Sequence, residues 1–173
     1  MKSVLVLLFL TATALAQDQS RIATAQAACG PKDVQFDVKN DPTPRPASHA
    51  DPDKATLYII GEDTGIAHPT IRVAVDGAWV GATHTHAYFS VPVEPGEHHL
   101  CASGVLVNPK YSPGTALAHL TAEAGKAYYF RTRVITINLA EVLDFEAIDS
   151  DQGKLLIAFI LSASRIRKTS NAA

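Results

Sequence analysis

Short runs of β-forming residues recur along most of this chain, and residues that favour tight turns separate them. The run Thr70–Val75 alternates apolar and polar side chains, and Asp76-Gly77 divides it from the next apolar run. An Asp-Gly pair favours a type I′ hairpin turn, in which both central residues need a positive φ. Pro95-Gly96 predicts a second turn, because proline presets its own φ and glycine accepts a positive one. The spacing therefore predicts antiparallel strands joined by short reversals.

Helical periodicity is almost absent, so the predicted fold class is all-β, a small antiparallel β-sandwich in which two sheets bury one face each. Asp149 and Gln152 have the spacing of a capping box, which predicts one short C-terminal helix over 150–158. The apolar run Leu155–Leu161 is too short to span a bilayer, and we expect it to be buried against the sandwich. The predicted strands are 34–38, 56–60, 70–75, 78–81, 88–93, 97–102, 116–122, 128–137 and 139–148.

The first sixteen residues have the features of a secretory signal. Lys2 supplies a positive charge, Val4–Leu10 is almost wholly apolar, and Ala14 and Ala16 are the small residues that signal peptidase needs before its cleavage site. We therefore expect residues 1–16 to be removed and the mature protein to reach the periplasm or the medium. No cysteine directly follows the apolar run, so no lipid anchor is expected, and no transmembrane segment is expected in the mature chain.

Composition divides the rest of the chain into four predicted parts. Residues 17–39 form an N-terminal segment with one short strand, and 40–53 form a proline-rich linker that disfavours helix and sheet. The β-sandwich domain is expected over 54–161, and a flexible tail over 162–173.

The two cysteines, Cys29 and Cys101, lie 72 positions apart. In an oxidising compartment an even number of cysteines favours a disulfide, and closing a loop of this length stabilises a fold by about 4 kcal/mol in the chain-entropy model. The alternative is a pair of buried thiols, because nothing local in the sequence brings the two residues together.

The charge balance argues against a nucleic-acid-binding protein. The chain has 15 basic and 17 acidic residues, and no run of Lys or Arg could neutralise several phosphates. It also lacks the common local motifs for nucleophilic catalysis, metal binding and nucleotide binding. We therefore assign no catalytic residue and no cofactor, although a triad dispersed along the chain would leave no such local motif.

Three histidines are the candidates for a metal site. His84 and His86 would share one face of a strand, and His98 follows the Pro95-Gly96 turn. Imidazoles from neighbouring strands suit zinc or copper. The alternative, which we favour, places His84 and His86 in an exposed loop and His98 at the sandwich edge, because no ligand spacing fixes a coordination geometry.

The large aromatic residues also allow two interpretations. On an exposed sheet face they could bind a glycan or a protein partner, whereas in a small sandwich they usually fill the core. We favour the core, with Phe130 pointing inward and Arg131 toward solvent. The residues concerned are Trp79, Tyr88, Tyr128 and Tyr129.

Four segments, in order, resemble the bacterial family called domain of unknown function 2846: Lys54–Ile60, Val73–Gly81, Val93–Leu100 and Glu123–Arg131. The middle two are also similar to PEGA-type surface modules, in which a V-D-G-x-x-V-G hairpin precedes a P-G-x-H turn. The resemblance covers residues 54–135 and implies a transthyretin-like or immunoglobulin-like β-sandwich of the cell envelope with no assigned reaction. Many members of that family look like lipoproteins, and this chain departs from them by lacking the lipidation cysteine.

These observations predict a secreted, non-catalytic β-sandwich module with a binding or structural role. Its partner would be an unknown envelope protein or a glycan, and an exposed sheet edge would be the natural docking surface through strand addition. One alternative is a periplasmic metal-binding protein that uses His84, His86 and His98. A less favoured alternative is a hydrolase with a dispersed triad.

Overall fold

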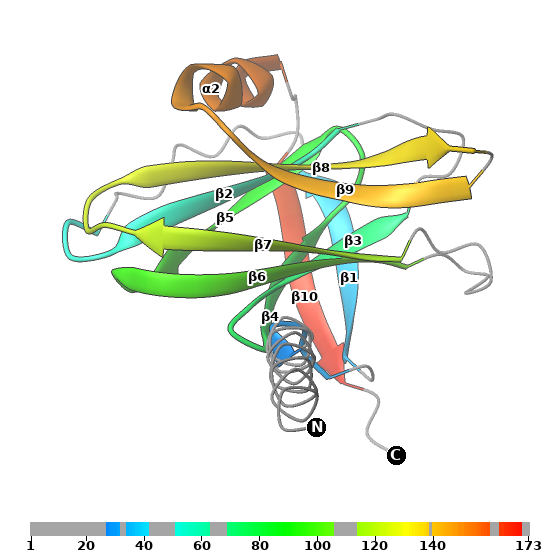
Figure 1. Ribbon diagram of the computed structural model, residues 1–173, viewed down its shortest axis with the longest axis horizontal. Coiled ribbons are helices and arrows are strands. Elements are labelled where there is room, and N and C mark those ends of the chain that lie inside the picture. The colour runs from blue at the N-terminus through cyan, green and yellow to red at the C-terminus, as the bar shows by residue number, and fades with distance from the viewer. Residues whose placement is uncertain are drawn as a thin grey trace, which may run out of the picture.

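The computed structural model describes residues 27–31, 34–41, 51–62, 69–105, 114–138, 140–159 and 163–170. Within them, two β-sheets pack face to face, as the sequence predicted (Figure 1). The larger sheet has the order β1-β10-β5-β2-β8-β9, with bounds Val34–Asp41, Ala163–Ser170, Ala87–Val93, Ala55–Gly61, Ala127–Ile137 and Ala140–Ile148. The smaller sheet has the order β4-β3-β6-β7, with bounds Ala78–Thr83, Thr70–Val75, Gly96–Val105 and Thr115–Ala122.

The predicted turns join these strands with the expected backbone geometry. Asp76 and Gly77, between β3 and β4, have φ values of 50° and 79°, the two positive angles that the Asp-Gly pair favours. Gly96, where β6 begins after Pro95, has a φ of 135°. Most strand pairs are antiparallel, but β2 pairs with β8, and β10 with β5, in parallel.

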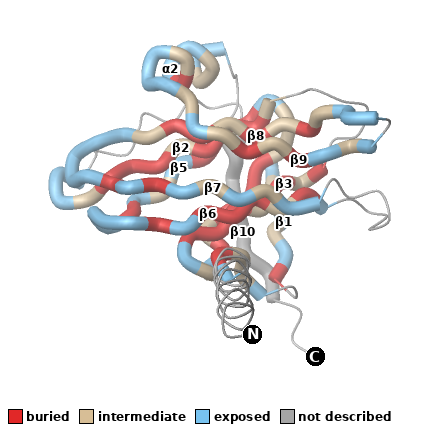
Figure 2. Tube along the Cα trace, in the orientation of Figure 1, coloured by how far each residue is buried: buried red, intermediate tan, exposed pale blue. Residues whose placement is uncertain are grey.

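Figure 2 marks the buried residues in red along the strands of both sheets. The main core lies between the sheets and consists of the side chains that strand alternation turns inward. On β6, His98, Leu100 and Ala102 are buried on this inner side. Phe130 is 1% exposed and packs on Phe145, as its predicted inward position requires. The fully buried large side chains include Leu57, Ile59, Ile60, Val73, Leu100 and Phe130.

Helix α2 (Ser150–Phe159) follows β9 and begins at the predicted cap. Oδ1 of Asp149 accepts hydrogen bonds from the backbone N–H groups of Asp151 and Gln152, both at 2.9 Å. Gly153 lets the helix approach the sheet closely, because a Cβ there would lie 2.3 Å from Cγ of Tyr129.

The expectation that the whole run Leu155–Leu161 is buried is wrong. Leu155 is 56% exposed and Phe159 is 76% exposed. The physical reason is that α2 meets the sheet along the side that carries Gly153, and residues on the opposite side of so short a helix point to solvent.

The expected flexible tail over 162–173 is also wrong for residues 163–170, which form β10. This strand pairs antiparallel with β1 from Val34↔Ser170 to Asp41↔Ala163. In this pairing the backbone N–H and C=O groups of residues 163–170 find hydrogen-bond partners on β1, which the sequence near them does not reveal. Residues 40 and 41 accordingly belong to β1 and not to a linker, while the other linker residues up to 50 lie outside the described part of the chain.

The predicted signal, with Ala14 and Ala16, also lies outside the described residues. Within the described residues, no helix has both the length and the apolar character needed to cross a bilayer.

Candidate functional site

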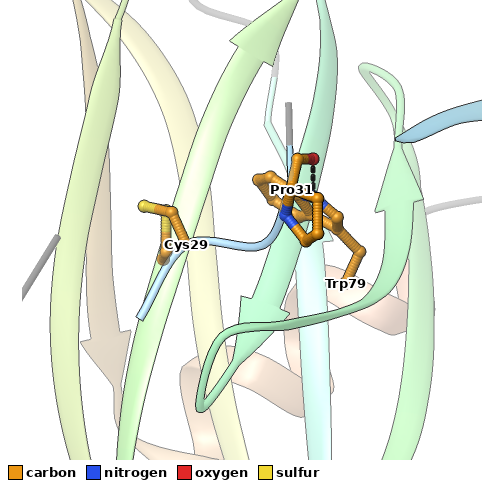
Figure 3. The surroundings of a disulfide bond; sticks show 4 residues. Cys29, Pro31 and Trp79 are labelled. Carbon is orange, nitrogen blue, oxygen red and sulfur yellow. Dashed lines mark hydrogen bonds between the residues drawn. A yellow bond between two sulfur atoms is a disulfide. The ribbon is translucent and has the colours of Figure 1, made fainter. Parts of the chain in front are cut away.

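Cys29 and Cys101 form a disulfide, with their Cα atoms 5.1 Å apart. The bond fastens residues 27–31 onto the outer face of the smaller sheet, where Ala28, Ala74, Trp79 and Cys101 form a second apolar cluster outside the main core. In Figure 3 the indole of Trp79 points at the backbone of Pro31, and its Nε1–H donates to the Pro31 carbonyl at 2.7 Å. This segment is therefore a covalently attached cover over the sheet.

Arg72 completes that cover. Its guanidinium lies over the Trp79 ring, with Cζ 4.5 Å from the ring centroid, and it donates to the Val34 carbonyl at 2.5 Å. Burial lowers the pKa of Arg72. Trp79 is thus buried, as favoured from the sequence, but on the outside of the sandwich and not in its core.

The other aromatic candidates are also covered or engaged. The rings of Tyr129 and Tyr58 stack with centroids 5.0 Å apart, and Tyr129 lies beneath α2. The hydroxyl of Tyr128 accepts a hydrogen bond from the N–H of Glu123 at 3.0 Å. Tyr88, on β5, is half-buried. These positions do not make an exposed aromatic platform for a sugar ring.

Arg131 points away from the core but is not free in solvent, which corrects the sequence expectation. It pairs with Glu146 and, at 3.3 Å, with Glu62, and its side chain is only 14% exposed. Arg133 pairs with Asp144 at 2.7 Å. The outer face of β8 and β9 therefore carries a ladder of opposite charges.

The three histidines proposed as metal ligands occupy different environments. His84 follows β4, with Nδ1 3.5 Å from Oγ1 of Thr70, and His86 lies exposed in the turn before β5 with a φ of 56°. His98 is buried on the inner face of β6. No group of three or more His, Cys, Asp or Glu suited to a metal ion occurs among the residues that the structure describes, so these three do not assemble into one.

Both ring nitrogens of His98 face hydrogen-bond acceptors. Nδ1 is 2.6 Å from Oδ2 of Asp76, and Nε2 is 2.7 Å from the Glu94 carbonyl oxygen. A backbone carbonyl and an ionised carboxylate only accept hydrogen bonds, so these two partners favour the doubly protonated ring. Burial lowers the pKa of His98, but the bonds to Asp76 and Glu94 outweigh it and the net pKa is raised.

Asp76 is the counterpart of this buried cation. Burial raises its pKa, whereas hydrogen bonds from His98 and from the His99 N–H lower it, and the net pKa is lowered. The pair resembles the Asp–His half of a catalytic triad, yet its second nitrogen faces a backbone carbonyl where a nucleophile would have to stand. His98 instead links the turn between β3 and β4, which holds Asp76, to the turn between β5 and β6, which holds Glu94. We call this pair the His98–Asp76 clamp.

The strand β7 stands out among the four strands that end the sheets. β1 carries Asp37 and Lys39, and β9 carries Glu141, Asp144 and Glu146. β4 is short and lies against β1 and β10, and its pairing with β3 shifts register between Val73 and Ala74 of β3. β7, with the sequence TALAHLTA, contains no Asp, Glu, Lys, Arg or Pro, and no described strand pairs with its outer edge, although β7 lies against β9 of the other sheet. It therefore lacks the charges and prolines that usually protect an edge strand.

A cleft of about 280 Å³ opens beside the second half of β7. Its other wall is the start of β8, which β9 leaves uncovered because the β8–β9 pairing begins at Tyr129↔Ile148. The start of α2 closes one end. The lining residues are His119, Leu120, Thr121, Ala127, Tyr128, Tyr129, Phe130, Ala147, Ile148 and Ser150.

The register of β6 and β7 brings together two histidines that lie far apart in the sequence and outside the set His84, His86 and His98. His99 lies directly opposite His119, and both are exposed on the outer face of the smaller sheet. Their ring centroids are 5.4 Å apart, with the planes inclined at 57°. Alternation along β6 places His99 outward, but only the cross-strand register identifies His119 as its neighbour.

Comparisons of the chain with models of known protein families, with curated proteins and with solved structures find no match. The resemblance to domain of unknown function 2846 and to PEGA-type modules therefore stays a prediction from the sequence.

Proposed function

We propose that this chain is an exported, non-catalytic β-sandwich module of the bacterial cell envelope that binds an extended peptide segment of another protein along β7. The observation that carries the proposal is the uncharged, proline-free edge of β7, with which no described strand pairs and beside which the cleft opens. Such an edge offers a row of backbone donors and acceptors to an added strand.

Two features support export. The first sixteen residues have the composition of a secretory signal, and disulfides such as Cys29–Cys101 persist mainly in oxidising compartments. A protein recovered from the cell envelope is expected to begin at Gln17 and to contain no free thiol. A cytoplasmic protein with reduced cysteines would contradict export while leaving the binding proposal open to its own test.

The shape of the cleft favours a peptide over two other candidate ligands for this edge, a second copy of the chain and a glycan. An added strand would direct alternate side chains toward the cleft beside β7, where an aromatic or large aliphatic group would meet Tyr128 and Leu120. A second copy of β7 would present Ala116 and Ala118 there, and these side chains are too small to fill it. A glycan would need exposed aromatic rings, which the engaged positions of Trp79 and Tyr129 do not supply.

The test uses linear peptides selected from a display library against the oxidised protein. We expect selected peptides to alternate apolar and polar residues and to include an aromatic one. Two matched charge substitutions locate the site: Leu117→Lys on β7, where the side chain is 43% exposed, and Val142→Lys on β9, where it is 39% exposed. Leu117→Lys is expected to weaken binding by about tenfold or more, because a charge on an open edge disfavours strand addition, and Val142→Lys to leave it unchanged.

Three outcomes would overturn the proposal. Equal losses in both variants would place the site elsewhere. A dimer that Leu117→Lys dissociates would make a second copy the occupant. Retention of a glycan, with no peptide selected and no effect of Leu117→Lys, would identify a sugar-binding surface instead.

A further inference from the structure

We propose that His99 and His119 form a binding site for one divalent transition-metal ion of the imidazole-preferring class, such as Cu²⁺ or Zn²⁺. The site lies on the outer face of the smaller sheet. His119 belongs to β7 and also lines the cleft, but the metal proposal does not rest on the peptide-binding proposal. It also differs from the set His84, His86 and His98 that the sequence suggested.

The first support is the distance between the rings. Two imidazoles that bind one ion with metal–nitrogen bonds of about 2.0–2.1 Å at angles of about 90° to 110° place their ring centroids about 4.5–5.2 Å apart. The observed separation of 5.4 Å is only slightly greater. Both side chains are exposed, so their χ angles are free to turn one nitrogen of each ring toward a shared ion.

The second support is the rigid placement of both residues. The backbone N–H of His99 donates to Oδ1 of Asp76 at 2.8 Å, and its carbonyl accepts from the N–H of Asp76 at 2.9 Å. His119 is held opposite by the antiparallel pairing that runs from Gly96↔Ala122 to Ser103↔Thr115. The ligand pair is therefore organised before the ion arrives.

The third support is the chemical state of the rings. Within the described residues, no hydrogen bond occupies a ring nitrogen of His99 or His119, whereas both ring nitrogens of His98 are engaged. The carboxylate of Glu97, two residues before His99, lies on the same face and adds a negative charge near the pair. Solvent would complete the coordination of the ion, because no third protein ligand of the usual types gathers there in the described chain.

Calorimetric titration of the oxidised protein, free of any histidine tag, with CuCl₂ and with ZnCl₂ tests this proposal. We expect one ion per chain, with Cu²⁺ bound more tightly than Zn²⁺, as the general order of divalent affinities requires. His99→Asn and His119→Asn should each weaken binding by about tenfold or more. The matched control His84→Asn should bind as the unchanged protein does, and circular dichroism verifies the fold of each variant.

A second readout assigns the ligands directly. Addition of ZnCl₂ should shift the imidazole NMR signals of His99 and His119 and leave those of His98 in place. Absence of binding at millimolar Cu²⁺ and Zn²⁺ would overturn the proposal, as would binding that neither His99→Asn nor His119→Asn weakens.

Discussion

The two sheets of this sandwich cover their outer faces by different means. The smaller sheet is covered by residues 27–31, which are attached through Cys29–Cys101 and seated under Trp79 and Arg72. The larger sheet is covered by α2, which has no covalent attachment to the sheet and approaches it through Gly153. A segment as short as 27–31 buries too little surface to stay attached by packing alone, so a disulfide holds it. Helix α2 packs on the stacked rings of Tyr58 and Tyr129 and needs no covalent attachment.

Removing the disulfide should give the largest effect and should act on one face first. The double variant Cys29→Ser with Cys101→Ser is expected to lose about 4 kcal/mol of unfolding free energy, because the unfolded chain regains loop entropy. Trp79 is the only tryptophan of the chain, so its fluorescence reports on this face alone. We expect its emission to shift to the red in denaturant before the tyrosine signal changes. If the tryptophan and tyrosine signals change together, at the denaturant midpoint of the unchanged protein, then the disulfide does not stabilise this face.

Replacing the indole should weaken the same cover by a smaller amount. Trp79→Phe removes the donor to the Pro31 carbonyl and weakens the contact with Arg72 while keeping an aromatic ring. The expected loss is about 2 kcal/mol in urea unfolding. Tyr58→Phe on the other face keeps the ring stack and serves as the control, and a loss as large there would contradict the contrast between the faces.

Gly153→Ala tests the helical cover. The new Cβ would collide with Tyr129, so we expect a net loss of about 1 kcal/mol even though alanine favours a helix. Lys154→Ala, at the exposed neighbouring position, should be neutral or slightly stabilising. If Gly153→Ala raises the melting temperature, then α2 does not lie against the sheet in solution.

The His98–Asp76 clamp should make the stability of the smaller sheet depend on pH. The raised pKa of His98 means that its contribution is complete below about 6.5 and is lost as the pH rises through the folded-state value. The lowered pKa of Asp76 means that its contribution is complete above about 3.8 and is lost as the pH falls through the folded-state value.

The free energies of unfolding of the unchanged protein and of His98→Gln should therefore differ most between about pH 4 and 6.5, by about 1 kcal/mol. Above pH 6.5 the difference should shrink. A difference that stays constant from pH 4 to 9 would show that His98 does not titrate in this clamp.

Much of the fold could be predicted because it is encoded locally. The Asp76-Gly77 turn and the alternation along β6 are read from neighbouring residues, and the cap at Asp149 needs only a spacing of three. β10 could not be predicted in this way, since its partner β1 lies more than 120 residues earlier in the chain. Such pairings depend on tertiary context, which local propensity does not contain.

The candidate site shows the same division. The sequence indicated that a sheet edge would be the docking surface, but choosing β7 required the strand order and the charges on the competing edges. His99 and His119 meet through register alone. The error at Leu155–Leu161 arose because hydrophobicity was taken to imply burial, a rule that holds in one direction only.

The pairing of β1 with β10 has a consequence for the order of assembly. During synthesis the residues of β1 emerge well before those of β10, so this ribbon forms only after all the residues between them have been made. Cys101 becomes accessible to Cys29 well before that, and oxidation is free to precede closure of the larger sheet. An exported and oxidised chain that lacks residues 163–170 would then keep residues 27–31 bonded to the smaller sheet while the edge of β5 that pairs with β10 stays open.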